Sequence, residues 1–394
     1  GSTRSSIDAF AERRRARLAL AEGDAKQNAR GIPRADDAPA FADQTLYRKT
    51  EKRVARISQT FDPHAPPRRV AMFDRARGLR GLVNRGNTCF AAACLQSLAH
   101  TPPLAEYVLR ESFSCDENAA NGTNRRASEV ASEFARVVRA IHRSDDLHSS
   151  VDAYNPHKFM NALKSYDTLK EFTDGQQHDS QEFLWSLVNE LDPNALDPYL
   201  NEGMVNVFAG ELRNTVTCKE CNTASPSPER FLNLSLPLRE SVTDCLDAFT
   251  AVEDLGDEDK VHCSKCNKLC EARKKVLVKS CPQVLVLHLK RFQWNDRGRP
   301  GRKIDTAVDV PQTLSLSPYL AEGAATANGG GESKYELFAV INHVGSLAGG
   351  HYTATADAGA GEWYAFNDER VSSAGDGPPK SSSNAYVLFY AISR

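Results

Sequence analysis

The pattern of apolar and polar residues divides the chain into two unequal parts. Residues 1 to about 75 are rich in Arg, Ala and Asp, hold few large apolar side chains and include five prolines. A segment of this kind can bury little hydrophobic core, so we expect residues 1–75 to be a largely flexible extension with a short helix around 9–21. From Gly81 onward apolar residues recur with regular spacing, and we expect a folded domain over residues 79–394.

The first half of this domain carries helical patterns. The Ala-rich stretch that begins at Cys89 repeats apolar side chains at the spacing of one helix face, with Asn87 or Thr88 as its N-cap. A second apolar stripe follows Asp179, which would cap its helix together with Glu182 in a capping box. Two helices are therefore predicted to begin close to these positions.

The second half of the domain is predicted to consist mainly of strands. Alternating or continuous apolar runs occupy residues 231–238, 284–292, 335–343, 351–356, 362–366 and 385–392. The segment 321–333, rich in Gly and Ala, is expected to be a mobile insertion between two strands. Helices followed by an antiparallel sheet indicate an α+β fold with a groove between two lobes.

Cys89 has the setting of a catalytic nucleophile. The first turn of a helix would favour its thiolate, because the helix dipole is positive at that end. A general base is available in His351, which lies 351 − 89 = 262 positions further along the chain in a Gly-Gly-His-Tyr sequence. Asn367 or Asp368 could orient the imidazole, and Asn84 could donate to an oxyanion. A lone Cys is usually a small hydrophobe and a lone His is usually structural, so the prediction depends on their combination.

Two Cys-x-x-Cys pairs form a second candidate site. They are Cys218 with Cys221 and Cys263 with Cys266, separated by 41 residues. Four thiolates suit a tetrahedral, structural Zn²⁺ ion, and the long gap fits an insertion whose two arms are joined by the metal. A redox motif or unpaired structural cysteines remain open, although the doubling of the motif argues against both.

Composition limits the expected setting and partners. Ten Cys among 394 residues are too few for a disulfide scaffold, and no apolar stretch resembles a signal peptide or a membrane span. We therefore expect a protein of the cytoplasm or nucleus that does not act at membranes. A net charge of −2 gives no sign of nucleic-acid binding. The basic run from Arg13 to Arg17 is either a solvated part of the tail or a contact for nuclear import or nucleic acid.

The segments around Cys89 and His351 resemble the two catalytic boxes of the ubiquitin-specific proteases. Three further segments are similar to that family, in the family's order and over about four-fifths of the chain: 176–184, 287–292 and 385–390. The resemblance implies a papain-like core with a helical thumb, an antiparallel β palm and zinc-bearing β fingers at about 205–275. The chain departs from the family after the nucleophile, where it has Phe-Ala-Ala-Ala in place of a frequent Tyr-Met-Asn-Ser.

The resemblance also implies a role for each site residue. The expected catalytic residues are the nucleophile Cys89, the base His351, the orienting groups Asn367 and Asp368, and the oxyanion donor Asn84. The residues expected to bind substrate are Gln177, Asp179, His343, Gly349, Gly350 and Tyr352. The implied activity is hydrolysis of the isopeptide or peptide bond after the C-terminal glycine of ubiquitin, by a monomeric catalytic domain with a structural zinc ion and no organic cofactor.

Several alternatives to this activity stay open. Segments 208–238 and 263–292 look similar to the branch that includes histone deubiquitinases, which would favour chromatin or ribosomal substrates. An inactive ubiquitin-binding scaffold, a zinc-ribbon module that recruits nucleic acid or protein, and a thiol protease for another ubiquitin-like modifier are the rival interpretations. The presence of Cys, His and Asn together argues against the first of these.

Overall fold

The structure is a computed structural model of the chain. It describes residues 78–109, 122–142, 153–191, 207–256, 259–293, 302–325, 333–346, 349–359, 361–378 and 380–393. The chain divides into two units, Gly1–Val70 and Ala71–Arg394. The whole first unit lies outside the described residues, and so do the predicted flexible extension, its helix at 9–21 and the basic run.

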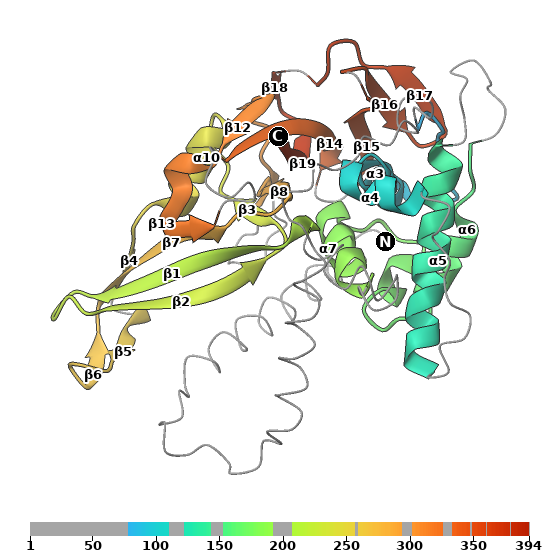
Figure 1. Ribbon diagram of the computed structural model, residues 1–394. Helices are drawn as coiled ribbons and strands as arrows, with labels where there is room; N and C mark the ends of the chain where they lie inside the picture. The colour runs from blue at the N-terminus through green and yellow to red at the C-terminus, as the bar shows by residue number, and fades with distance from the viewer. Residues whose placement is uncertain are drawn as a thin grey trace, which may run out of the picture. The chain divides into compact units, whose positions relative to one another are not determined.

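Helices come first along the second unit and pack around one buried helix, α3 (Figure 1). Every residue of α3 is buried, because nine are Ala, Leu, Phe or Cys and the polar Gln96 and Ser97 donate to the carbonyls of Arg80 and Ala93. The helix begins at Cys89, as predicted, and α7 begins directly after Asp179, as predicted. The helices of this part are α3 (Cys89–Ala99), α4 (Pro102–Leu109), α5 (Gly122–His142), α6 (His157–Leu163) and α7 (Ser180–Glu190), with the 3₁₀ helix η1 (Lys170–Thr173).

An eight-stranded sheet follows, which we name the palm sheet. Its strand order is β17-β16-β15-β14-β19-β8-β3, and β12 pairs with β14. All its pairs are antiparallel except β3 with β8, which is parallel and so departs from the predicted antiparallel sheet. The strands are β3 (Leu234–Leu236), β8 (Val284–Leu289), β12 (Thr313–Ser315), β14 (Lys334–Ser346), β15 (Gly349–Asp357), β16 (Trp363–Asn367), β17 (Arg370–Ser373) and β19 (Ala385–Ile392).

Both faces of the palm sheet are covered, and β8 shows this most clearly. Val284 and Val286 belong to the hydrophobic core shared with the helices, whereas Leu285, Leu287 and Leu289 belong to a second core on the other face. The second core includes residues of α10 (Val242–Thr250). A strand buried on both faces has no polar side, which is why β8 is apolar at every position except His288.

A second sheet, the fingers sheet, has the order β13-β7-β1-β2, with β4 paired to β7. Figure 1 shows β1 and β2 as a long ribbon whose tip lies beside the small β5–β6 hairpin. One prediction is wrong here, because residues 321–325 form part of a strand that pairs in parallel with β7, and not a mobile insertion. The remaining residues, 326–332, lie outside the described part of the chain. The strands are β1 (Gly210–Cys218), β2 (Ala224–Phe231), β4 (Glu253–Leu255), β5 (Val261–Cys263), β6 (Lys268–Cys270), β7 (Ala272–Ser280) and β13 (Leu320–Ala325).

Strand β2 lies at one edge of the fingers sheet, and all its residues except Phe231 are exposed. It contains Pro226 and Pro228, which pair with Thr215 and Arg213 of β1. A proline has no backbone N–H, so it fits an edge strand where that position faces solvent and not the neighbouring strand. The ladder with β1 therefore stays intact across both prolines.

The buried guanidinium of Arg291 closes the end of the palm sheet beyond β8. It donates to the backbone carbonyls of Ala385 at 2.6 Å, Ile304 at 3.0 Å, Thr306 at 2.8 Å and Ser382 at 2.9 Å. Hydrogen bonds to a charged group are stronger than neutral ones. The carbonyls lie near two short ladders, which are β9 (Phe292–Gln293) with β10 (Arg302–Lys303) and β11 (Val308–Asp309) with β18 (Ser381–Ser382).

Candidate active site and thiol cluster

The Cys89 thiol is buried at the first position of α3. Thr88 is the N-cap residue, but its hydroxyl makes no bond to the helix and instead donates to Asn84 Oδ1 at 3.0 Å. Burial raises the pKa of Cys89, and this outweighs the backbone N–H groups of Tyr352 and Phe90, which lower it. The predicted stabilisation by the helix start is therefore present but is not dominant. A nucleophilic thiolate at this position needs a base beside it.

His351 supplies an imidazole from β15, the strand that packs against α3. Its Nε2 lies 2.7 Å from Asn367 Oδ1 and 3.8 Å from Asp368 Oδ2. Because Asn367 occupies Nε2, Nδ1 is the ring nitrogen left to act on a thiol. Tyr352, the next residue of β15, reaches the Cys89 thiol with its backbone, so the fold brings His351 to the start of α3.

Asn84 links the loop that precedes Cys89 to the turn after β16. Its Nδ2 donates to Asp368 Oδ2 at 3.0 Å, across 284 positions of sequence. Its Oδ1 accepts from the backbone N–H groups of Gly86 at 3.1 Å and Thr88 at 3.2 Å. The carboxamide is thus fixed in orientation, with one N–H given to Asp368. We name Asn84, Cys89, His351, Asn367 and Asp368, the five residues predicted to be catalytic, the catalytic network.

The backbone of the same turn packs closely against the segment that precedes Cys89. Asp368 has a φ of 51°, in the left-handed region, and its carbonyl accepts from the Leu82 N–H at 2.8 Å. A Cβ at Gly81 would collide with the carbonyls of Asp368 and Glu369. Glycine is therefore required at position 81 for the two segments to approach each other.

Two of the residues expected to bind substrate form a reciprocal pair. Gln177 Nε2 donates to the Gly350 carbonyl and Gly350 N–H donates to Gln177 Oε1, both at 3.1 Å. A Cβ on Gly350 would collide with the His343 ring, and one on Gly349 would approach Gln177 Oε1 at 3.4 Å. The side-chain amide thus holds the backbone directly before His351.

Three other residues of that group are buried. Asp179 Oδ1 accepts from Gln181 N at 2.8 Å and Glu182 N at 3.3 Å, which confirms it as the N-cap of α7. The Tyr386 hydroxyl donates to Asp179 Oδ2 at 2.6 Å. His343 packs against Tyr352, and burial lowers the pKa of His343 to about 4, so this imidazole is neutral at neutral pH. Their role in substrate binding stays a prediction.

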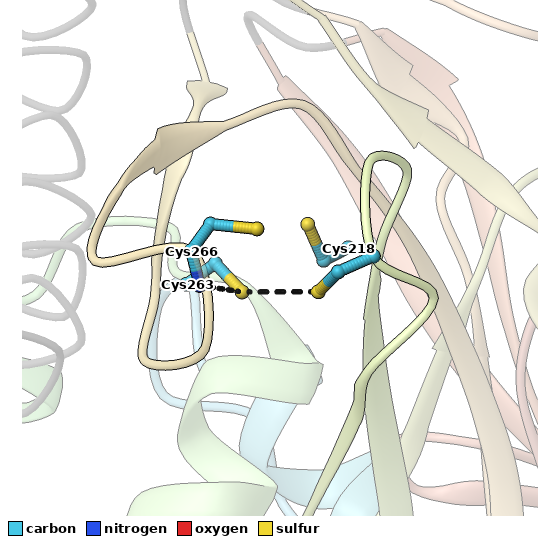
Figure 2. A group of neighbouring side chains, drawn as sticks. Cys218, Cys263 and Cys266 are labelled. Carbon is cyan, nitrogen blue, oxygen red and sulfur yellow. Dashed lines mark hydrogen bonds between the residues drawn. The ribbon is translucent and has the colours of Figure 1, made fainter.

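The four cysteines of the two Cys-x-x-Cys pairs meet, as expected for a metal site. The sulfurs of Cys218, Cys221, Cys263 and Cys266 all lie within 4.8 Å of one another, and those of Cys221 and Cys263 are 3.5 Å apart. Figure 2 shows Cys263 and Cys266 on one turn, with their sulfurs directed toward Cys218 on another. These four thiols could hold a metal ion, and we name them the thiol cluster.

Sequence reasoning missed two residues beside the thiol cluster. Cys270 is buried, and its sulfur lies within 4.8 Å of the Cys266 sulfur and of a Glu220 carboxylate oxygen. The only signal for it was a third cysteine four positions after Cys266, outside the Cys-x-x-Cys pattern. The Thr223 hydroxyl, 3.2 Å from Cys221 Sγ, lowers the pKa of Cys221 to about 6. One thiolate is therefore favoured in the cluster, and thiolates are the metal-binding form.

Comparison with known proteins identifies the family. Residues 80–390 match the family model described as ubiquitin carboxyl-terminal hydrolase. The chain belongs to this family. It is 33% identical over 365 residues to "Ubiquitin carboxyl-terminal hydrolase 21" of Homo sapiens, covering 79% of this chain and 61% of that protein. It is 30% identical over 391 residues to "Ubiquitin carboxyl-terminal hydrolase 2" of Rattus norvegicus, covering 90% and 60% respectively. The chain thus spans about three-fifths of the length of these relatives.

Solved structures of family members share the fold. The "SAGA Ubp8/Sgf11/Sus1/Sgf73 DUB module bound to ubiquitin aldehyde" matches with a TM-score of 0.67 and 26% identity, covering 90% of this chain and 77% of that chain. The module bound to monoubiquitin matches with a TM-score of 0.66 and 25% identity. These matches confirm the predicted α+β fold and the family resemblance. Among the described helices, none combines the length and the apolar character that crossing a membrane requires.

Proposed function

We propose that the protein is a thiol-dependent deubiquitinase that hydrolyses the isopeptide or peptide bond after the C-terminal glycine of ubiquitin. The observation that carries the proposal is the 2.7 Å contact between His351 Nε2 and Asn367 Oδ1, on the strand that packs against the helix of Cys89. Because Asn367 contacts Nε2, Nδ1 is the ring nitrogen left for the thiol. Family membership and ubiquitin-bound relatives support the same substrate.

The catalytic network assigns one role to each group. His351 Nδ1 takes the proton of Cys89, whose sulfur then forms a bond to the carbonyl carbon of the terminal glycine. The second Nδ2–H of Asn84, which is not the one given to Asp368, would donate to the oxyanion. When the carbon–nitrogen bond breaks, His351 gives its proton to the departing amine. His351 then accepts a proton from water, whose oxygen replaces sulfur and releases the acid.

The buried thiol explains why the base has to be so closely held. Burial favours the neutral form of Cys89, so the thiolate is best formed together with an imidazolium cation. Asn367 and Asp368 stabilise that cation, one by a hydrogen bond and the other by its charge at 3.8 Å. The proposed mechanism therefore depends on the pair of charges, and not on a permanently ionised thiol.

The test is hydrolysis of a fluorogenic ubiquitin C-terminal amide by Cys89→Ala. We expect kcat/KM to fall on the order of 10³-fold or more, because the covalent route is lost. Cys94→Ser is the matched control, since Cys94 lies on the same helix and a serine can still donate to the Ser180 carbonyl, now 3.1 Å from its sulfur. Equal turnover by Cys89→Ala and the parent protein would contradict the proposal.

A panel of warhead probes separates the rival substrates. Probes built on ubiquitin should label Cys89, whereas those built on other ubiquitin-like modifiers should not. Preferential labelling by another modifier would move the proposal to that substrate. A chain that binds ubiquitin without labelling would instead be a scaffold.

We further propose that the thiol cluster holds one structural Zn²⁺ ion. Zinc–sulfur bonds of about 2.3 Å place tetrahedral sulfurs slightly under 4 Å apart, close to the 3.5 Å between Cys221 and Cys263. A bound ion would fix two arms of the fingers sheet to each other and supply no catalytic chemistry. Metal analysis should find about one zinc per chain, and a folded chain without zinc would refute this site.

We propose the cytoplasm or nucleus as the location. All nine cysteines within the described residues are free thiols, which suits a reducing compartment. Fractionation of cells with an antibody to the chain would test this, and recovery from a secretory compartment would contradict it.

A further inference from the structure

A fifth cysteine lies against the thiol cluster and has no part in the proposed tetrahedral site. Cys270 is 1% exposed, and its thiol donates to the Lys268 carbonyl with sulfur and oxygen 3.6 Å apart. Its sulfur, the Cys266 sulfur and a carboxylate oxygen of Glu220 lie within 4.8 Å of one another. A second set of metal-binding atoms thus overlaps the first and shares Cys266 with it.

The hairpin that carries these cysteines places them differently. Cys263 ends β5 and Cys270 ends β6, so the backbone of both is held in a ladder, where Cys270 pairs with Val261. Cys266 lies between them on the turn and is half-buried. The turn passes through Asn267, which has a left-handed φ of 52°. Among the three, Cys266 is therefore the one outside the ladder, and its turn is held by the bonds from Cys266 N–H to Cys263 Sγ at 3.5 Å and from Asn267 N–H to the Cys263 carbonyl at 2.8 Å.

The neighbouring charges close this side of the cluster. Lys268 Nζ lies 2.8 Å from Glu220 Oε2, an ion pair that joins the hairpin to the turn between Cys218 and Cys221. Glu220 is exposed and forms an ion pair with Lys268, whereas Cys270 is buried and lies beside the cluster. The softer thiolate is also the better ligand for zinc. Of the two added groups, Cys270 is the one suited to reach the ion.

We propose that Cys270 is a reserve metal ligand, which takes the place of Cys266 whenever that thiolate leaves the ion. This inference rests on the proposed zinc site. With zinc bound, Cys270 would supply a thiolate in place of Cys266, so the ligand set would keep four thiolates and the same charge. The proton that Cys270 loses passes to the released Cys266 thiolate. With Cys270 in place, loss of the Cys266 thiolate would not leave the site one ligand short.

The first test uses the zinc-loaded chain with its four cluster ligands intact. Zinc transfer to a chromophoric chelator should be about ten-fold faster from Cys270→Ser than from the parent chain, as expected for loss of a supporting residue at a metal site. Cys281→Ser is the control, because Cys281 is also a buried free thiol but lies outside the cluster. It should release zinc at the parent rate. Equal rates for Cys270→Ser and the parent would overturn the proposal.

The second test removes the ligand that Cys270 should replace. Cys266→Ser should still bind one Co²⁺ with the charge-transfer absorbance of four thiolates. The double variant, Cys266→Ser with Cys270→Ser, should show the weaker absorbance of fewer than four thiolates. Cys263→Ser should lose more affinity than Cys266→Ser, since Cys263 lies on the restrained strand beside Cys221. Equal losses for Cys263→Ser and Cys266→Ser would overturn the reserve role.

These outcomes separate the inference from the function on which it rests. A parent chain that binds no metal overturns both the zinc site and the reserve ligand. A parent chain that binds one zinc, with Cys270→Ser indistinguishable from it, overturns the reserve ligand alone. Hydrolysis of ubiquitin amides, measured in the same samples, reports on the catalytic network separately.

Discussion

The catalytic network and the thiol cluster both join distant parts of the chain, but they do so by different physical means. Asn84 and Asp368 are 284 positions apart, and both lie on segments anchored by a large hydrophobic core that includes the whole apolar side of α3. The thiol cluster joins a short hairpin to the end of β1, and its own small core consists of cysteines. The difference implies that folding builds the catalytic network directly, whereas the thiol cluster depends on a metal.

The largest expected effect is a loss of activity that leaves the thiol cluster unchanged. His351→Ala should lower kcat/KM on the order of 10³-fold, because it removes the base and the acid of the proposed reaction. Zinc content should be unchanged, since β15 is far along the chain from the hairpin and its backbone pairing is kept. The measurements are hydrolysis of a ubiquitin amide and metal analysis. Loss of zinc in this variant would show that the two regions are coupled.

The next largest effect is destabilisation of the fingers by loss of the metal, without a change at Cys89. Cys263→Ser, or removal of metal by a chelator, should destabilise the fingers by several kcal/mol, as expected when a structural zinc is lost. The Cys89 thiol should keep its rate of alkylation by iodoacetamide, because its surroundings are set by the other core. The rate of proteolysis within the fingers tests the expected destabilisation. The rate of Cys89 alkylation tests whether the catalytic network stays unchanged. A parallel fall in alkylation would contradict the independence of the regions.

Acid should act on the catalytic region through His343. Its folded pKa of about 4 lies below the ordinary value of 6.5, so between these pH values the unfolded chain binds a proton that the folded chain does not. Stability due to this group is therefore full above pH 6.5 and is lost as the pH falls toward 4, by an amount on the order of 3 kcal/mol. His343→Gln should flatten the stability curve in this window, measured by urea unfolding. The exposed His157→Gln should leave it unchanged.

The smallest effect concerns the pair between Gln177 and Gly350. Gln177→Ala removes two hydrogen bonds and should lower kcat/KM by about 3- to 10-fold, because the backbone before His351 becomes less restrained. Gln176→Ala is the matched control, since among the described residues the Gln176 side chain has no hydrogen-bond partner and its backbone N–H donates to Asp174 Oδ1 at 2.8 Å. Equal effects of the two substitutions would show that the reciprocal pair has no special role.

Sequence patterns predict most of the elements near the residues that we propose to be catalytic. The helices at Cys89 and after Asp179 were predicted from apolar spacing, and β14, β15, β16 and β19 from strand-like runs. Helix α5 was missed, although Val130, Phe134 and Ile141 lie on its buried side. These residues are four and seven positions apart, so apolar spacing alone could have located this helix.

Other elements carried no local signal at all. Strand β2 is exposed over nearly its whole length and contains two prolines, so neither alternation nor β-propensity marks it. It is a strand only because β1 pairs with it. Likewise, the bond between Asn84 and Asp368 and the approach of Cys270 to Cys266 depend on tertiary structure, which local patterns do not encode.

The prolines of β2 have a consequence for how the molecule behaves at high concentration. The free edge of a sheet is a template to which another chain can add a strand, and long exposed edges promote aggregation. At Pro226 and Pro228 the outward side of β2 offers no N–H, so an incoming strand would find two of its carbonyls without donors. The fingers can therefore extend into solvent as a long ribbon and still resist edge-to-edge addition of strands from other chains.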